Sequence, residues 1–186
     1  MIHPEIQWPP AYEPALADGI VSNEIEVKDL TPEQIWPYLT NISDWDRFTK
    51  DVMDATFIDP AVEDPHLFPK AEFTYKEAGL DLAAHTLEVI KPKDDRSGRI
   101  SWEGNAIGSD QAAFSYCHAW LVAMGPNGKG CRILTEMSIK GKLASTDILN
   151  TLHTINGQWL EGLVTYVRQH LTETNHPRTP ANGPTR

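Results

Sequence analysis

The stretch AAFSYCHAWLV, residues 112–122, reads as a β-strand whose two faces differ in character. Because successive side chains of a strand point to opposite faces, one face carries Phe114, Tyr116, His118 and Trp120, and the other carries mostly small residues. An aromatic face of this kind is typical of a hydrophobic core. The imidazole and the phenol hydroxyl within it raise the question of what these polar groups meet inside the protein.

An Asn-Gly pair at residues 127–128 follows this strand and predicts a hairpin. With a two-residue turn at that pair, His118 faces Met137 and Trp120 faces Thr135 on the next strand, CRILTEMSIKG. A slip by one residue would mix the apolar and polar faces, so we expect this register.

Further strands and three helices are predicted outward from this hairpin. Thr31 and Gln34 have the spacing of a capping box, and Pro32 suits the first position of a helix, which Pro37 is expected to kink or shorten. A second short helix follows within SDWDRFTKD. The remaining strands are expected at residues 20–27, 52–58, 68–78, 80–90 and 99–105.

The last predicted element, from about Ser145 to about Leu171, is a long amphipathic helix. At about 100° per residue, leucine, isoleucine, valine and tryptophan side chains gather on one broad face. Asn156 lies near the centre of that face, and His153 lies close beside it. The helix is therefore expected to lie on an apolar surface that also meets two polar groups.

Composition and charge limit the classes of function. The chain has 186 residues, 40% hydrophobic and 23% charged, which is typical of one soluble globular domain. The net charge of −10 disfavours binding to nucleic acid or to an anionic membrane. No apolar run approaches the roughly 20 residues that span a bilayer, and the N-terminus lacks the features of a signal peptide. We therefore expect a cytoplasmic protein, in which Cys117 and Cys131 are free thiols.

Three regions are expected along the chain. Residues 1–19 hold four prolines together with Trp8 and Tyr12, and they predict an extended arm whose aromatic residues pack against another part of the structure. Residues 20–171 are expected to form a single domain. The polar, proline- and glycine-rich residues 172–186 predict a disordered tail.

The order of these elements, with the segments EIEVKDLTPEQIWPYLTNISDWDRF, RISWEG, HAWLV and RILTEMSIKG, resembles the START/SRPBCC superfamily. That superfamily includes polyketide cyclases and dehydratases, lipid-transfer domains and hormone-binding proteins. The resemblance covers residues 20–171 and implies an α+β helix-grip fold, in which a curved antiparallel sheet of about seven strands surrounds the long C-terminal helix, with two short helices after the first strand. It also implies a cavity between sheet and helix, where inward polar groups meet water or a ligand.

The phases of the strands and the helix give the expected lining of this cavity. His118, His85 and Tyr116 are the candidate catalytic residues, because histidine titrates near neutral pH and suits general acid–base chemistry. His85 and His118 lie on next-but-one strands, roughly 10 Å apart, which is a gap that a small ligand bridges. The remaining ligand-binding candidates are Phe73, Tyr75, Trp102, Trp120, Met137, His153, Asn156 and Leu160.

The histidines also have simpler explanations. Each imidazole can form a hydrogen bond to a tyrosine, an asparagine or a buried water and have no further role. A zinc site made of His85, His118 and His153 is conceivable, because three imidazoles form catalytic zinc centres. No compact ligand motif supports such a site, so neither a metal nor a cofactor is expected.

Three hypotheses about function follow. In the first, the chain is a cavity enzyme, a lyase or isomerase of the cyclase/dehydratase kind, that binds a small aromatic or polyketide-like molecule and moves protons on it. In the second, the same aromatic lining serves a non-catalytic carrier of a hydrophobic ligand. In the third, the acidic surface and the arm with Trp8 and Tyr12 make the chain a protein-interaction module.

Overall fold

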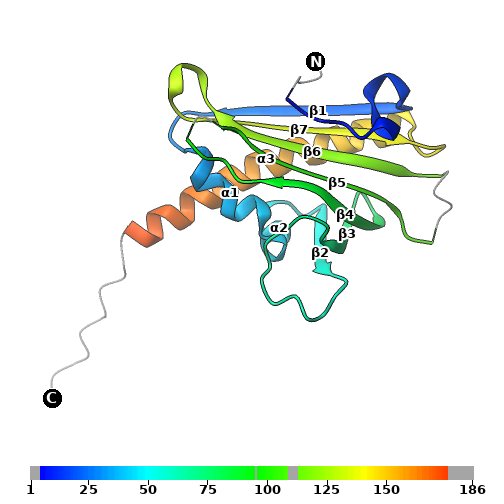
Figure 1. Ribbon diagram of the computed structural model, residues 1–186, viewed down its shortest axis with the longest axis horizontal. Coiled ribbons are helices and arrows are strands. Elements are labelled where there is room, and N and C mark those ends of the chain that lie inside the picture. Colours follow the sequence, from blue (N-terminus) through cyan, green and yellow to red (C-terminus); the bar gives the residue numbers. More distant parts are fainter. Residues whose placement is uncertain (1–4, 95, 109–112, 176–186) are drawn as a thin grey trace.

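A computed structural model describes residues 5–94, 96–108 and 113–175 of the chain. A seven-stranded antiparallel sheet packs against one long helix, α3, and two short helices, α1 and α2 (Figure 1). This is the predicted α+β helix-grip fold. The helices are α1 Pro32–Thr40, α2 Trp45–Phe48 and α3 Thr146–Asn175, and the strands are β1 Gly19–Val27, β2 Val52–Phe57, β3 Glu72–Glu77, β4 Leu80–Ile90, β5 Gly98–Ala106, β6 Ser115–Met124 and β7 Cys131–Lys140.

The sheet is a meander of six strands to which the first strand is added at one edge. Strands β2 to β7 pair in sequence order, and β1 pairs with β7, so the order across the sheet is β1-β7-β6-β5-β4-β3-β2. The predicted hairpin register is confirmed, since His118 lies opposite Met137 and Trp120 lies opposite Thr135. The connection itself differs from the prediction: it contains a 3-10 turn, Pro126–Gly128, and is longer than two residues.

Several element boundaries also differ from the predicted ones, and β6, expected over residues 112–122, runs from Ser115 to Met124. Strand β3 begins at Glu72 instead of residue 68, because Lys70 has a left-handed backbone (φ +67°) and Ala71 donates a turn hydrogen bond to the Phe68 carbonyl. Helix α3 continues to Asn175, so the first four residues of the predicted tail are helical. The rest of that tail, residues 176–186, lies outside the described residues.

The inner face of the sheet is the face that α3 covers (Figure 1). The short helix α2 packs between β2 and α3. Gly162 of α3 allows this contact, because a Cβ atom at that position would meet the Phe48 backbone, with its Cα only 3.1 Å away. Close packing of α2 thus closes the interior on the side of β2.

The outer face of the sheet carries the N-terminal arm. Ile6, which is buried, and Trp8, which is half-buried, pack on Ala119, Leu121 and Leu134 of the neighbouring strands β6 and β7. The arm continues through two 3-10 turns, Pro10–Tyr12 and Pro14–Leu16, into β1. Its aromatic residue Trp8 therefore packs on the chain's own sheet, which weakens the support that this residue gives to the interaction-module hypothesis.

No described helix combines the length and the apolar character that crossing a membrane requires.

Candidate functional site

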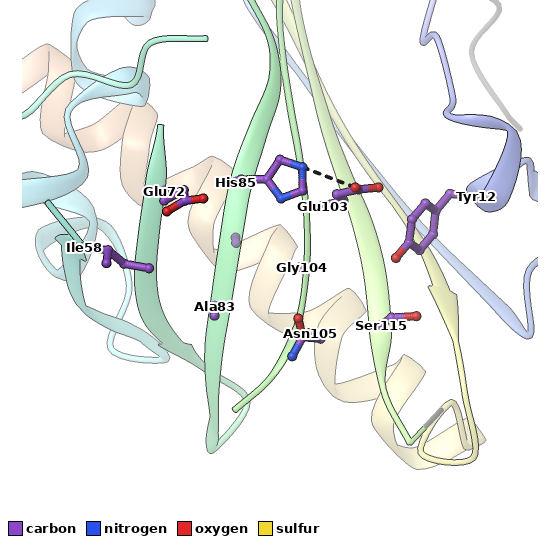
Figure 2. Close-up of a pocket in the computed structure, with 10 residues that line it drawn as sticks. Tyr12, Ile58, Glu72, Ala83, His85, Glu103, Gly104, Asn105 and Ser115 are labelled. Atoms are coloured by element: carbon purple, nitrogen blue, oxygen red, sulfur yellow. Dashed lines mark ion pairs between the residues drawn. The ribbon is translucent and has the colours of Figure 1, made fainter. Parts of the chain in front are cut away.

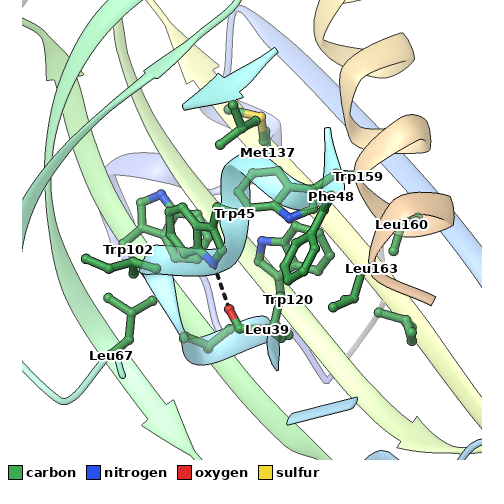
Figure 3. Close-up of a cluster of buried hydrophobic side chains, with 14 of the residues drawn as sticks. Leu39, Trp45, Phe48, Leu67, Trp102, Trp120, Met137, Trp159, Leu160 and Leu163 are labelled. Carbon is green, nitrogen blue, oxygen red and sulfur yellow. Dashed lines mark hydrogen bonds between the residues drawn. The ribbon is translucent and has the colours of Figure 1, made fainter. Parts of the chain in front are cut away.

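Four tryptophans fill the interior between the sheet and α3 (Figure 3). Trp45 of α2 lies at the centre, stacked on Trp102 with ring centroids 5.5 Å apart and edge-on to Trp159 at 5.1 Å. Trp120 contacts Trp159 at the same centroid distance, 5.1 Å. The Trp45 indole nitrogen donates to the Leu39 carbonyl at 3.0 Å, which fixes the ring in this position.

Most of the predicted lining residues face this interior. Tyr116, His118 and Asn156 are inward and fully buried, as the phases of β6 and α3 predict. The same holds for the apolar and aromatic candidates Phe73, Tyr75, Trp102, Trp120, Met137 and Leu160.

The predicted hollow at these residues is not present. His118 and Asn156 each have 0% exposure, and the His118 ring is in contact with the indoles of Trp102, Trp120 and Trp159. The physical reason is α2, which inserts Trp45 into the volume that a bare sheet and helix would leave open. The interior is thus lined as expected but closed.

His118 is held as a neutral imidazole. Its Nε2 atom lies 2.6 Å from Thr135 Oγ1, whereas Nδ1 has no hydrogen-bond partner among the described residues. Complete burial lowers the pKa of His118 to about 3, because an imidazolium would lose its hydration. In this closed state His118 is therefore a hydrogen-bonding group and does not exchange a proton near neutral pH.

Asn156 and two indole groups add further unpartnered polar atoms. Neither Nδ2 nor Oδ1 of Asn156 has a hydrogen-bond partner within the described part of the chain, and the same is true of Nε1 of Trp120 and Trp159. His118 contacts both tryptophans, at ring-centroid distances of 5.4 Å and 5.9 Å. These atoms and His118 Nδ1 together form what we call the unpartnered interior cluster.

A second polar group lies farther toward β3. The hydroxyls of Tyr75 and Tyr116 are 2.8 Å apart, and Trp102 Nε1 donates to Tyr75 at 3.3 Å. Gly104 makes room for Tyr116, because a Cβ atom there would come within 2.8 Å of its hydroxyl. Burial raises the pKa of both phenols well above the ordinary value, so both stay protonated.

Glu77 shares the inner face of β3 with Tyr75. Its side chain is buried, and neither carboxyl oxygen has a hydrogen-bond partner among the described residues. Burial raises the pKa of Glu77 to about 7, and the nearby Tyr75 hydroxyl offsets only part of that rise. At neutral pH this carboxyl group therefore populates both its acid and its base form.

His85 does not line the interior, and its predicted inward orientation is wrong. It lies on the outer face of β4 with 47% of its side chain exposed, and its Nε2 atom is 3.3 Å from Glu103 Oε1 (Figure 2). A β-bulge between Thr86 and Glu88 explains the error. Because the extra residue reverses the alternation of faces, Glu88 points outward although its number has the parity of the inward residues.

His153 is also outside the interior. It lies on the exposed side of α3, where its carbonyl accepts a hydrogen bond from Asn23 Nδ2 at 3.0 Å. His153 therefore lies beside the apolar face of α3 but is exposed to solvent. His85, His118 and His153 lie on three separate surfaces, and within residues 5–94, 96–108 and 113–175 no set of three His, Cys, Asp or Glu side chains is arranged to hold a metal.

Three important interior residues were not among the predicted site residues. Glu77 follows Phe73 and Tyr75 at steps of two, so strand alternation carried the signal for its inward orientation. Thr135 was predicted to face Trp120, but its bond to His118 was not predicted. Trp45 had no such signal, because the docking of a four-residue helix follows from tertiary packing.

Comparisons with known proteins agree with this fold. Residues 19–172 match the family described as polyketide cyclase / dehydrase and lipid transport. No protein with a curated function matches the chain. A crystal structure of a hypothetical protein from Helicobacter pylori is 27% identical, with a TM-score of 0.79 over 90% of this chain and 99% of that one.

More distant structures share the fold. A protein from Nitrosospira multiformis is 15% identical, with a TM-score of 0.60 over 83% of this chain and 99% of that one. A norcoclaurine synthase point mutant from Thalictrum flavum, in complex with a transition-state analogue, is 10% identical, with a TM-score of 0.52 over 82% of this chain and 96% of that one. Since the family match spans the whole sheet and most of α3, the chain belongs to the polyketide cyclase / dehydrase and lipid transport family.

Proposed function

We propose that this protein binds a small apolar or aromatic molecule with oxygen substituents between the sheet and α3, and that Glu77 and the two buried phenols move a proton on it. The reaction class is acid–base cyclisation or dehydration. The observation that supports binding is the unpartnered interior cluster.

Unpartnered buried polar groups are rare, because each one loses its hydration without a replacement, at about 1–3 kcal/mol. Here His118, Trp120 and Trp159 carry such atoms and contact one another. Asn156 carries two more, and it lies three residues before Trp159 on α3, which places the two on neighbouring turns of the same helix face. A ligand with hydroxyl or carbonyl groups supplies both the donors and the acceptors that these atoms lack. Aromatic walls with a few polar atoms are the usual composition of small-molecule sites.

The closed interior has one element suited to admit a ligand. Helix α2 is only four residues long and presents Trp45 to the interior. A surface hollow of about 220 Å³ lies beside Ile42 and Ser43, just before α2, and another of about 380 Å³ lies beside Arg47 and Phe48. Because space is available on both sides of α2, its outward movement would withdraw Trp45 and leave a volume bounded by the unpartnered interior cluster.

The chemistry would be carried by Glu77 with Tyr75 and Tyr116. In its base form, Glu77 removes a proton from the carbon next to a substrate carbonyl, and that carbon then attacks a second carbonyl of the same molecule to close a ring. A phenol protonates the new alkoxide and regains a proton from the acid form of Glu77. Glu77 then removes the remaining proton of the same carbon while a phenol protonates the hydroxyl, so the C–O bond breaks, water leaves and a C=C bond forms. Protonated Glu77 again returns its proton to the phenolate. Tyr116 keeps its proposed catalytic role, whereas the low pKa of His118 favours a role in positioning.

The first experiment tests binding. 2-Naphthol is the probe, because it is aromatic and carries one hydroxyl, and its fluorescence is titrated against the protein. We expect saturable binding that Asn156→Leu weakens about tenfold, the loss of one or two ligand hydrogen bonds. The control His153→Leu, on the exposed side of the same helix, should bind as the wild type does. Equal affinity in all three proteins would contradict binding at the unpartnered interior cluster.

A non-catalytic carrier is the second candidate, favoured by the low pKa of His118 and by the completely closed interior. Native mass spectrometry with liquid chromatography separates the two functions on freshly purified wild type and Glu77→Gln. An enzyme gives different bound molecules, since the variant retains a precursor that is one water heavier or an uncyclised isomer with another retention time. A carrier gives the same molecule in both proteins.

A further inference from the structure

A hollow of about 400 Å³ lies on the outer face of the sheet, away from the interior (Figure 2). Its floor is formed by β4 and β5, one wall is Tyr12 of the N-terminal arm, and the opposite side is Ile58, directly after β2. Its volume falls within the range of small-molecule sites. We name it the arm pocket and propose that it binds a small organic cation, an aliphatic amine, independently of any ligand in the interior.

The charge of the arm pocket favours a cation. Glu72, His85 and Glu103 lie opposite one another on the neighbouring strands β3, β4 and β5, so they form a row across the outer face. Glu103 is paired with His85, whereas no ion pair with any described residue is formed by Glu72. Among the residues that the structure describes, the pocket lining contains no lysine or arginine. Two carboxylates on next-but-one strands, roughly 10 Å apart, face the pocket with one histidine between them.

The neutral polar groups favour a ligand that donates hydrogen bonds. The Asn105 amide nitrogen already donates to the Ala106 carbonyl at 3.3 Å, so its Oδ1 is the atom left to receive a donor. The Ser115 hydroxyl also lines the pocket and lies near the Tyr12 hydroxyl. Acceptors therefore predominate over donors in this lining, which matches an ammonium group with three N–H donors and no acceptor.

The arm supplies an aromatic and an apolar component as well. The Tyr12 ring stands at the side of the pocket next to Glu103 and Ser115 (Figure 2), and an aromatic ring attracts a nearby cation through its π-electrons. Ile58, 54% exposed, and Ala83 offer apolar surface to a short aliphatic chain. The chemistry of the site thus fits an amine with a short hydrocarbon segment, and the spacing of Glu72 and Glu103 fits a diamine.

Isothermal titration calorimetry at 0.15 M salt with 1,5-diaminopentane as the probe tests the proposal. We expect one saturable site in the wild type, and no heat of binding with 1,5-pentanediol, which has the same chain without charge. Glu72→Gln and Glu103→Gln should each weaken binding about tenfold, the effect of one charge-assisted contact. Tyr12→Leu should weaken it as well.

The control is Glu173→Gln, which removes one exposed carboxylate from α3, far along the chain from the arm pocket. Its affinity should equal that of the wild type, and all variants should keep the wild-type thermal unfolding temperature within about two degrees, as surface changes do. Absence of saturable binding to the wild type, or equal weakening by Glu173→Gln and by the pocket variants, would overturn the proposal, because the amine would then respond only to the overall acidity of the protein.

Discussion

Glu77 couples proton binding to folding through one buried carboxyl group. Burial raises its pKa from 4.5 to about 7. Between these two values the folded state binds more protons than the unfolded state, so the free energy of unfolding decreases as the pH rises through this interval. The stabilising effect of the neutral form is complete below pH 4.5 and is lost above pH 7.

Glu77→Gln removes this ionisation and tests it. We expect the variant to gain about 3 kcal/mol of unfolding free energy relative to the wild type between pH 4.5 and pH 8. Urea unfolding at both pH values measures the change. Glu72→Gln, on the exposed outer face of the same strand, is the control for losing one carboxylate. A stability difference that is the same at both pH values would show that Glu77 has no raised pKa.

At the scale of elements, the contact between α2 and α3 depends on a glycine. Replacing a mid-helix glycine by alanine ordinarily stabilises a helix by up to about 1 kcal/mol. At Gly162 we expect the opposite, a loss of about 2 kcal/mol or more, because the new Cβ atom would meet the Phe48 backbone and push α2 away.

Gly157→Ala is the matched control in the same helix. A Cβ atom there meets only Asn23 Nδ2 at 3.4 Å, which is an ordinary contact, so this variant should gain stability. Thermal unfolding of both variants shows whether each substitution raises or lowers the stability. Stabilisation by Gly162→Ala would mean that α2 does not pack against α3 as closely as described.

The N-terminal arm is the second element whose role can be measured. Ile6 is 8% exposed on the outer face of the sheet, whereas Leu16 in the same arm is 60% exposed. We expect Ile6→Ala to lower the free energy of unfolding by about 2 kcal/mol, and Leu16→Ala to change it by less than about 0.5 kcal/mol. Urea unfolding monitored by tryptophan fluorescence compares them, and equal effects would argue against a docked arm.

The whole molecule combines two opposite responses to pH. His118, with a folded pKa of about 3 against 6.5 for the free side chain, binds protons preferentially in the unfolded state, so stability decreases as the pH falls from 6.5 to 3. Glu77 acts in the other direction between pH 4.5 and 7. The two effects cancel between about pH 4.5 and 6.5.

This cancellation predicts the shape of a stability profile. The unfolding free energy of the wild type minus that of the double variant Glu77→Gln/His118→Leu should be constant from pH 4.5 to 6.5. It should then fall by about 1.4 kcal/mol per pH unit below 4.5. Urea unfolding at five pH values provides the profile, and a steady slope across pH 4.5–6.5 would exclude one of the two shifted groups.

Much of the fold was predictable from the sequence, because alternation along strands and the hairpin register depend on neighbouring residues. The pairing of His118 with Met137 and the inward side chains of β3 and β6 follow from that period of two. The orientation of His85 was not predictable in the same way, since the bulge after Thr86 changes the period without a glycine or proline to mark it.

The state of the candidate site was less predictable than its lining. Periodicity places Tyr116 and Asn156 inside, but whether the interior is open depends on the docking of α2 and on the rotamer of Trp45, which depend on contacts distant in sequence. The outer face shows the same limit. The sequence predicted that the aromatic residues of the arm pack against another part of the structure, but not that the surface they meet is Ala119, Leu121 and Leu134.

The pairing of β1 with β7 has a consequence for folding during synthesis on the ribosome. Gly19 pairs with Ile139 and Val27 pairs with Cys131. The backbone of β1, which is synthesised first, therefore cannot form its hydrogen bonds in the sheet until β7 has been synthesised. Strands β2 to β6 can assemble meanwhile, each beside the strand synthesised just before it. We expect a nascent intermediate in which β1 remains unprotected while the meander forms, and pulsed hydrogen exchange on stalled chains would show its amides slowing only after residue 140 has left the exit tunnel.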